Sequence, residues 1–196
     1  MFDFLLSTKK RIVEVLQAYY PFKIDSLDYS GNVLDAISTN VLYDGTKADL
    51  DGTAYIIPPS DIIGIGDFAL SVKFMTRDSL KFAQGIFCNA GVYGGYAGSL
   101  VFFYQNSTLY CRVGNSSDSE TVVFNADVSY FIFENTEHYI ELSRVGATYT
   151  LTIDNIIVNT YLKNVPVAIA SGSTNIIGAR NLTGGLDGTL RDFKVY

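Results

Sequence analysis

The chain has 196 residues, of which 48% are hydrophobic and 17% are charged, so it holds enough apolar side chains to bury one core. Its formal net charge of −6 opposes contact with phosphate backbones, which argues against nucleic acid binding. The sequence contains no run of roughly 18 apolar residues, so it predicts no membrane-spanning helix. Near the amino terminus, apolar residues precede basic ones, the reverse of the order in a secretory signal.

Residues 1–18 predict a short amphipathic helix. Leu5, Ile12 and Leu16 recur at helical spacing, and Tyr19 continues the pattern. In one interpretation, such a helix packs on its own domain. In the other, it anchors the chain to a partner or to further copies, since the spacing also suits a short coiled-coil seam. Under the second interpretation, Leu5, Ile12 and Leu16 are the assembly residues.

From position 19 to 196 the pattern changes to short strands, and this range is expected to form one domain. Apolar residues alternate strictly in 68–74, and 100–104 is almost wholly apolar, as in a strand covered on both faces. Asp154 and Asn155 tolerate the left-handed conformation of a tight hairpin turn. About a dozen short strands without an interior helix predict an all-β antiparallel sandwich or jelly roll.

The two cysteines, Cys88 and Cys111, fall on strands that we expect to be separated by one other strand. Two strand steps of ~4.8 Å exceed the reach of a disulfide. The sequence therefore predicts two buried thiols.

Several motifs occur in a characteristic order along the chain. They are Asp28–Asn32 (DYSGN), Ile65–Val72 (IGDFALSV), Glu137–Arg144 (EHYIELSR), Leu151–Asn155 (LTIDN) and Gly188–Tyr196 (GTLRDFKVY). This order resembles the laminin-G-like branch of the concanavalin A-like lectin/glucanase superfamily, over roughly positions 19–196. The resemblance implies an antiparallel jelly-roll β-sandwich. The chain departs from the family pattern at Glu137, where Trp is common, and at Arg191, which replaces an acid.

Some members of that superfamily bind structural calcium through acids near the first turn and near the end of the domain. Asp28 and Asp192 occupy such positions and supply the oxygen ligands that calcium prefers. Arg191 places a cation beside any such site. We therefore expect no cofactor, with calcium at Asp28 and Asp192 as the alternative.

The sequence predicts no catalytic residues. Glucanases of the superfamily carry closely alternating acids on one strand, whereas Glu134, Glu137 and Glu141 are spaced so that a strand would scatter them over both faces. His138 is the only histidine, which removes a multi-histidine zinc site and leaves any nucleophilic triad dependent on one residue. We expect a non-enzymatic protein.

Two loops have compositions suited to surface recognition. The segment 89–99 contains Tyr93, Tyr96 and several glycines, so its rings could stack on sugars or on a partner. The paired turns at 171–175 and 180–185 add Arg180. An ordinary strand connection with exposed tyrosines is the alternative interpretation. Tyr93, Tyr96 and Arg180 are the predicted ligand-binding residues.

A lectin-like domain without catalytic residues, preceded by a helix, predicts a structural or binding subunit of a large assembly. We expect a bacteriophage virion protein, such as a head fibre, tail fibre or capsid decoration, assembled in the host cytoplasm. Its expected partners are other virion proteins through the helix, host surface glycans, and further copies of itself. The alternative is a carbohydrate-binding or adhesion module of a bacterial cell-surface protein, located outside the cell.

Overall fold

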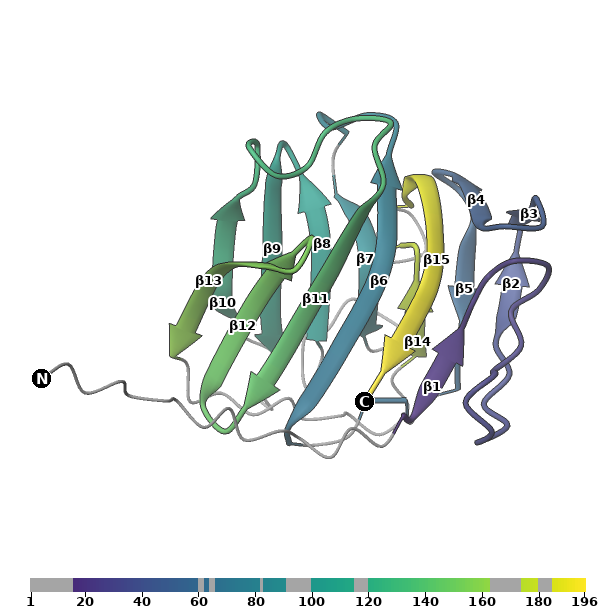
Figure 1. The fold of residues 1–196 in the computed structure, drawn as a ribbon, viewed down its shortest axis with the longest axis horizontal. Coiled ribbons are helices and arrows are strands. Elements are labelled where there is room, and N and C mark those ends of the chain that lie inside the picture. Colours follow the sequence, from purple (N-terminus) through teal and green to yellow (C-terminus); the bar gives the residue numbers. More distant parts are fainter. Residues whose placement is uncertain are drawn as a thin grey trace, which may run out of the picture.

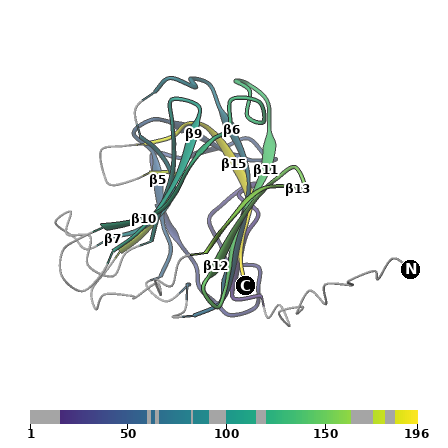
Figure 2. The ribbon, with the colours of Figure 1, turned by 90° about the vertical axis from the view of Figure 1, so that its left-hand side faces the viewer.

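The protein is an all-β sandwich of two antiparallel sheets that face each other across one core (Figure 1, Figure 2). The computed structural model describes residues 16–59, 62–63, 66–81, 83–90, 100–114, 120–162, 174–179 and 185–196. These residues contain no helix, and therefore none that is long and apolar enough to cross a membrane.

The first sheet has eight strands, seven of which lie in one row. In order they are β13 (Ile156–Leu162), β12 (Thr148–Ile153), β11 (His138–Val145), β6 (Phe68–Thr76), β15 (Asp187–Val195), β4 (Ala48–Asp51) and β3 (Leu42–Tyr43). The eighth strand, β1 (Ala18–Tyr20), pairs with the end of β15. One side of β15 therefore contacts β6, and its other side contacts β4 and then β1.

The second sheet has seven strands. In order they are β10 (Glu120–Asp127), β9 (Thr108–Gly114), β8 (Leu100–Gln105), β7 (Gln84–Ala90), β14 (Thr174–Ile177), β5 (Tyr55–Ile57) and β2 (Ile37–Thr39). Every pairing observed in both sheets is antiparallel.

Aromatic side chains fill the part of the core beside β1. The Phe193 ring of β15 lies 6.2 Å from the Tyr20 ring, 6.5 Å from the Phe22 ring and 5.9 Å from the Phe87 ring, measured between centroids. All four rings are fully buried. This cluster joins the two sheets, because Phe87 belongs to the seven-stranded sheet and Phe193 to the eight-stranded sheet.

Three strand predictions are confirmed. The alternating apolar residues of β6 face the core. Asp154 and Asn155 form the β12–β13 turn with φ values of 50° and 66°, the left-handed pair that a tight hairpin needs. In β8, Phe102 faces the main core, while Phe103 belongs to a second buried cluster on the opposite face. That strand is covered on both sides, as expected from its apolar sequence.

The predicted helix over 1–18 is wrong at its carboxyl end. Ala18 starts β1 and pairs with Val195, and Leu16 is not helical. Pairing with β15 buries the Tyr20 side chain in the core. The stabilisation from this pairing and burial outweighs the local preference for a helix that the spacing of Leu16 and Tyr19 indicates. Leu5 and Ile12 lie outside the described residues.

The prediction for the cysteines is confirmed. Cys88 lies on β7 and Cys111 on β9, with β8 between them, and both are buried thiols. Cys88 faces the second cluster, whereas Cys111 faces the main core. Burial raises the pKa of the Cys111 thiol, so this sulfur stays protonated.

Candidate functional site

The loop that follows β1 begins with a strained turn at Phe22. This residue has a φ of 53°, a conformation that a bulky side chain adopts rarely. The turn persists because the Phe22 ring is buried and stacks on Tyr20 at 5.7 Å between centroids. Directly after it, Lys23 and Ile24 are exposed. The buried ring therefore anchors a segment whose next side chains face solvent.

Asp28 folds the far end of this loop back onto β1. Its Oδ1 accepts the backbone N–H groups of Tyr19 and Ser30, both at 2.9 Å, and its Oδ2 accepts the Leu34 N–H at 3.1 Å and the Ser30 hydroxyl at 2.7 Å. Partial burial of the carboxyl favours its neutral form, but the four hydrogen bonds outweigh that effect and lower the pKa of Asp28. Asp28 therefore stays ionised and fixes the loop.

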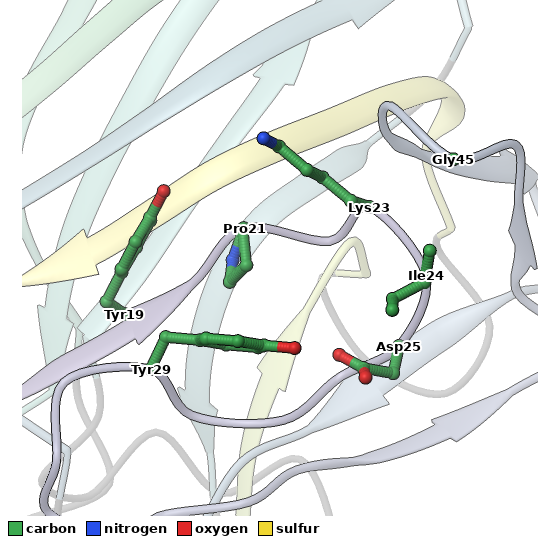
Figure 3. Close-up of a pocket in the computed structure, with 7 residues that line it drawn as sticks. All are labelled: Tyr19, Pro21, Lys23, Ile24, Asp25, Tyr29 and Gly45. Carbon is green, nitrogen blue, oxygen red and sulfur yellow. The ribbon is translucent and has the colours of Figure 1, made fainter.

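Between the turn and Asp28 lies a pocket of about 310 Å³ (Figure 3). Residues from β1, from the following loop and from the β3–β4 connection line it: Tyr19, Pro21, Lys23, Ile24, Asp25, Tyr29 and Gly45. Figure 3 shows Pro21 beside Tyr19 and above the Tyr29 ring, and Tyr29 extending toward Asp25. Tyr29 is 53% exposed, so much of its ring is available to a ligand. The Gly45 N–H donates to the Lys23 carbonyl at 3.0 Å, which ties the two sides of the pocket together.

A chain of polar contacts holds Tyr19 from the side of β15. The Tyr19 hydroxyl donates to Asp192 Oδ1 at 3.2 Å, and Asp192 Oδ2 pairs with Lys73 Nζ at 2.8 Å. Lys194 Nζ lies 5.0 Å from the centroid of the Tyr19 ring, within the range of a cation–π contact. These contacts hold the Tyr19 side chain in place on one side of the pocket.

Asp192 reaches Tyr19 because β15 bulges at this point. Asp192 has a φ of 53°, and the pairing of β15 with β6 shifts register between Arg191 and Lys194. A bulge redirects a side chain from the face that simple alternation would give it. Burial favours the neutral form of Asp192, but Lys73, the Tyr19 hydroxyl and the Arg191 charge outweigh that effect and lower its pKa. Burial and then the Asp192 charge raise the pKa of Tyr19.

The pocket carries one charge of each sign. Lys23 is exposed and Asp25 is half-buried. Asp25 Oδ1 accepts the Leu27 N–H at 3.2 Å, while Asp25 Oδ2 has no hydrogen-bond partner within the described parts of the chain. The site therefore combines a free carboxylate oxygen and an ammonium group with two aromatic side chains.

The structure brings the two predicted metal residues to opposite ends of one tyrosine. Asp28 accepts the backbone N–H of Tyr19, and Asp192 accepts its hydroxyl. Protein donors already occupy both carboxylates, including the cation Lys73. Among the described residues, no three His, Cys, Asp or Glu side chains converge in a manner that could hold a metal ion.

The predicted ligand-binding residues Tyr93, Tyr96 and Arg180 lie outside the described residues. Of the assembly residues, only Leu16 is described; its carbonyl accepts Asn32 Nδ2 at 3.0 Å. Sequence reasoning missed the Tyr19–Tyr29 pocket. The turn motif Asp28–Asn32 was a signal beside it, but Tyr19, at the start of the predicted domain 19–196, was not singled out as a binding residue.

The acidic residues considered for catalysis have separate structural partners. Glu134 accepts the Ser79 N–H and hydroxyl, Glu137 pairs with Arg191, and Glu141 accepts the Tyr139 hydroxyl.

His138 is the first residue of β11 and is buried. Its Nδ1 lies 2.7 Å from Asp154 Oδ2, and its Nε2 accepts the Phe133 N–H at 3.2 Å. An Nε2 that accepts an N–H bears no proton, so Nδ1 is the donor to Asp154. The ring connects the β10–β11 loop to the β12–β13 turn.

No protein-family model matches this chain, and no curated protein matches it. Solved structures do share its fold. Domain 4 of AbnA, an extracellular arabinanase from Geobacillus stearothermophilus solved with arabinotriose, has a TM-score of 0.72 at 14% identity over 92% of this chain and 91% of that one. The binding domain of botulinum neurotoxin DC, solved with rat synaptotagmin II, gives 0.69 at 14% identity over 93% of this chain.

The binding domain of Paraclostridial Mosquitocidal Protein 1 gives a TM-score of 0.66 at 17% identity over 92% of this chain. The chain spans 48% of each toxin domain, about half its length, but nearly the whole of the arabinanase domain. These likenesses show that the chain has the two-sheet β-sandwich fold of these domains.

Proposed function

We propose that the chain is a non-catalytic binding module that holds a saccharide in the pocket beside β1. The observation that carries this proposal is the composition of the pocket, in which Tyr19, Tyr29 and Pro21 adjoin Lys23 and Asp25. A sugar ring has an apolar face that packs on aromatic side chains, and hydroxyls that need both donors and acceptors. A pocket of about 310 Å³ lies at the small end of the usual ligand-site range of about 300–1,000 Å³.

The two charges favour a neutral sugar. A saccharide carboxylate would be attracted by Lys23 but repelled by Asp25. A cationic ligand would be attracted by Asp25 but repelled by Lys23. Neutral hydroxyls donate to the Asp25 carboxylate and accept from the Lys23 ammonium without that conflict. Neutral hexose or pentose units are therefore the proposed ligand class.

The neighbours of the fold support a binding role. The arabinanase domain was solved with arabinotriose, and the two toxin domains are named as binding domains. We also propose that the sandwich is a jelly roll of the concanavalin A-like type, as the resemblance in the sequence implies. The strand order in the two sheets supports this assignment.

The non-catalytic part of the proposal rests on the carboxylates. Most glycosidases use two carboxyl groups about 5–10 Å apart on either side of the scissile bond. Among the described residues that line the pocket, Asp25 is the only acid. Glu134, Glu137 and Glu141 hold hydrogen bonds or ion pairs elsewhere.

The test is a glycan array followed by calorimetric titration of the best ligand. Tyr29→Ala should weaken binding at least tenfold, since stacking and shape at the pocket are both lost; Asp25→Asn should weaken it less. Tyr130→Ala is the matched control, because Tyr130 is 85% exposed and lies in the β10–β11 connection, away from the pocket lining. Its affinity should equal that of the wild type.

Two outcomes contradict the proposal: no glycan bound on the array, or equal affinity for the Tyr29→Ala protein and the wild type. If the Tyr29→Ala protein binds normally and Tyr93→Ala or Tyr96→Ala abolishes binding, the ligand site is the loop 89–99 rather than the pocket. Turnover of any polysaccharide would overturn the non-catalytic assignment.

We further propose that the module serves a larger assembly, a virion fibre or capsid decoration, with a bacterial cell-surface protein as the alternative. The binding-domain neighbours support attachment to a surface in either setting. Recovery of the protein with phage particles favours the first, and recovery with the cell envelope favours the second. We also propose that the fold needs no metal, so its melting temperature should be the same in EGTA and in calcium.

A further inference from the structure

The outermost strands of the two sheets differ in how they are protected against pairing with another chain. Native proteins protect such edges by keeping them short or by placing charges on them. Strands β1, β2 and β3 have only two or three residues each. Strand β10 contains Glu120 and Asp127. Strand β13 has seven residues, Ile-Ile-Val-Asn-Thr-Tyr-Leu, without a charge, a proline or a glycine.

Three of the exposed side chains of β13 are large and apolar, and the other two, Asn159 and Thr160, are polar but uncharged. Ile156, Ile157 and Leu162 are between 53% and 78% exposed. Val158 and Tyr161 instead pack inward against the core, and the Tyr161 ring stacks on Phe124 of β10 at 4.6 Å between centroids. The strand is therefore anchored from inside. Within the described parts of the chain it pairs only with β12, and it forms the left margin of the sandwich in Figure 1.

The β12–β13 hairpin is also almost free of charge, although Lys163 follows it directly in the sequence. From Thr148 to Leu162 the one charged residue is Asp154, whose carboxylate is engaged by His138 and by the Tyr139 N–H. The whole chain has a net charge of −6, so two copies repel each other over most approaches. An uncharged edge is where a second copy meets the least repulsion.

Two features limit how tightly this edge can pair. The β12–β13 register shifts between Leu151 and Thr152, so β13 has a bulge that interrupts it. Asn159 Oδ1 accepts the Thr160 N–H at 2.8 Å, which already satisfies one amide of the strand. A single interrupted strand pair buries less than the roughly 1,600 Å² of a standard interface.

We propose that β13 is the docking edge for a second copy of this chain, paired antiparallel about a two-fold axis into one continuous sheet. A two-fold axis presents the same surface from both copies, so the apolar residues of one edge meet those of the other. Because the paired area is small, the dimer is weak and forms reversibly with concentration. The dimer would carry two copies of the pocket beside β1. The proposal for β13 does not depend on saccharide binding by that pocket.

The experiment is sedimentation velocity over roughly 1 µM to 1 mM, the range in which a weak interface dissociates. The wild type should shift from monomer to dimer as its concentration rises. Ile157→Lys should raise the dissociation constant at least tenfold, and so should Asn159→Asp, which keeps an acceptor for the Thr160 N–H. Ile37→Lys, on the edge strand β2 and 70% exposed in the wild type, is the matched control and should dimerise normally.

Hydrogen exchange locates the contact. At high concentration the β13 amides should exchange more slowly than in dilute protein, whereas those of β2 should not change. A wild type that stays monomeric throughout overturns the proposal, as does equal weakening by Ile157→Lys and Ile37→Lys. Association through residues 1–15 would survive Ile157→Lys and leave β13 exchange unchanged, and that outcome overturns it too.

Discussion

Replacing Asp28 by Asn tests whether its carboxylate holds the loop that carries the pocket. The amide oxygen of Asn can take the place of Oδ1 and keep the N–H bonds from Tyr19 and Ser30. The amide nitrogen then replaces Oδ2; the Ser30 hydroxyl can rotate to accept from it, but the Leu34 N–H loses its acceptor. A lost hydrogen bond to a charged group costs about 1.5–3 kcal/mol, and solvent exposure here reduces that to about 1–2 kcal/mol at pH 7.

The same substitution predicts a pH dependence. Hydrogen bonds lower the pKa of Asp28 in the folded state despite the opposing effect of burial. Its contribution to stability is therefore complete above the unfolded pKa of about 3.9 and is lost as the pH falls through the lower folded value. Asn does not titrate at this pH. The stability difference between wild type and Asp28→Asn should therefore shrink below about pH 4.

Urea denaturation followed by circular dichroism, at pH 7 and again in acid, measures both effects. Asp25→Asn is the control: it perturbs one exposed hydrogen bond, from the Leu27 N–H, and should cost less than about 0.5 kcal/mol. The reasoning is refuted if the two variants are equally destabilised at pH 7, or if the Asp28→Asn difference is as large at pH 3 as at pH 7.

Three further predictions concern the sandwich itself. Gly188→Ala should prevent stable folding, because the added Cβ would overlap the backbone oxygen of a β6 residue. Gly146→Ala is the control: there is open space around it but its φ is +58°, so the substitution should lower the free energy of unfolding by only about 1 kcal/mol, as measured in a thermal melt. Phe193→Ala should lower the free energy of unfolding by about 3–5 kcal/mol, since its fully buried ring contacts both sheets; a loss under 1 kcal/mol would contradict the description of the core. Cys88 and Cys111 should react with a thiol reagent only after denaturant is added, and fast labelling of the native protein would show that they are accessible.

The predictable parts of the fold were those in which neighbouring residues determine the outcome. The hairpin at Asp154 and Asn155 needs two adjacent residues that tolerate positive φ, and the sequence shows both. Likewise, the continuous apolar run of β8 directly indicates a strand buried on both faces. Such patterns need no knowledge of distant contacts.

The candidate site was not predictable in the same way. Tyr19 is bound by Asp192, 173 residues away, and that contact requires a bulge in β15 that no local pattern announces. Tyr19 also fits helical spacing with Leu16, so the local signal pointed to the wrong element. The pairing of β1 with β15 overrides it. Contacts of this kind become visible only when the strand order is known.

The position of β15 has a consequence for how the protein is made. This strand follows every other strand of the sandwich along the chain, yet it lies between β6 on one side and β4 and β1 on the other. Until β15 has left the ribosome, the first sheet exists as three unconnected parts, namely β13–β12–β11–β6, β4–β3 and β1. At about 5–20 residues per second, β1 waits roughly 10–30 s for its partner. Folding of this sheet therefore cannot be completed before β15 is available, and a nascent chain stalled before Asp187 would expose the unpaired edges of β4 and β6 to chaperones.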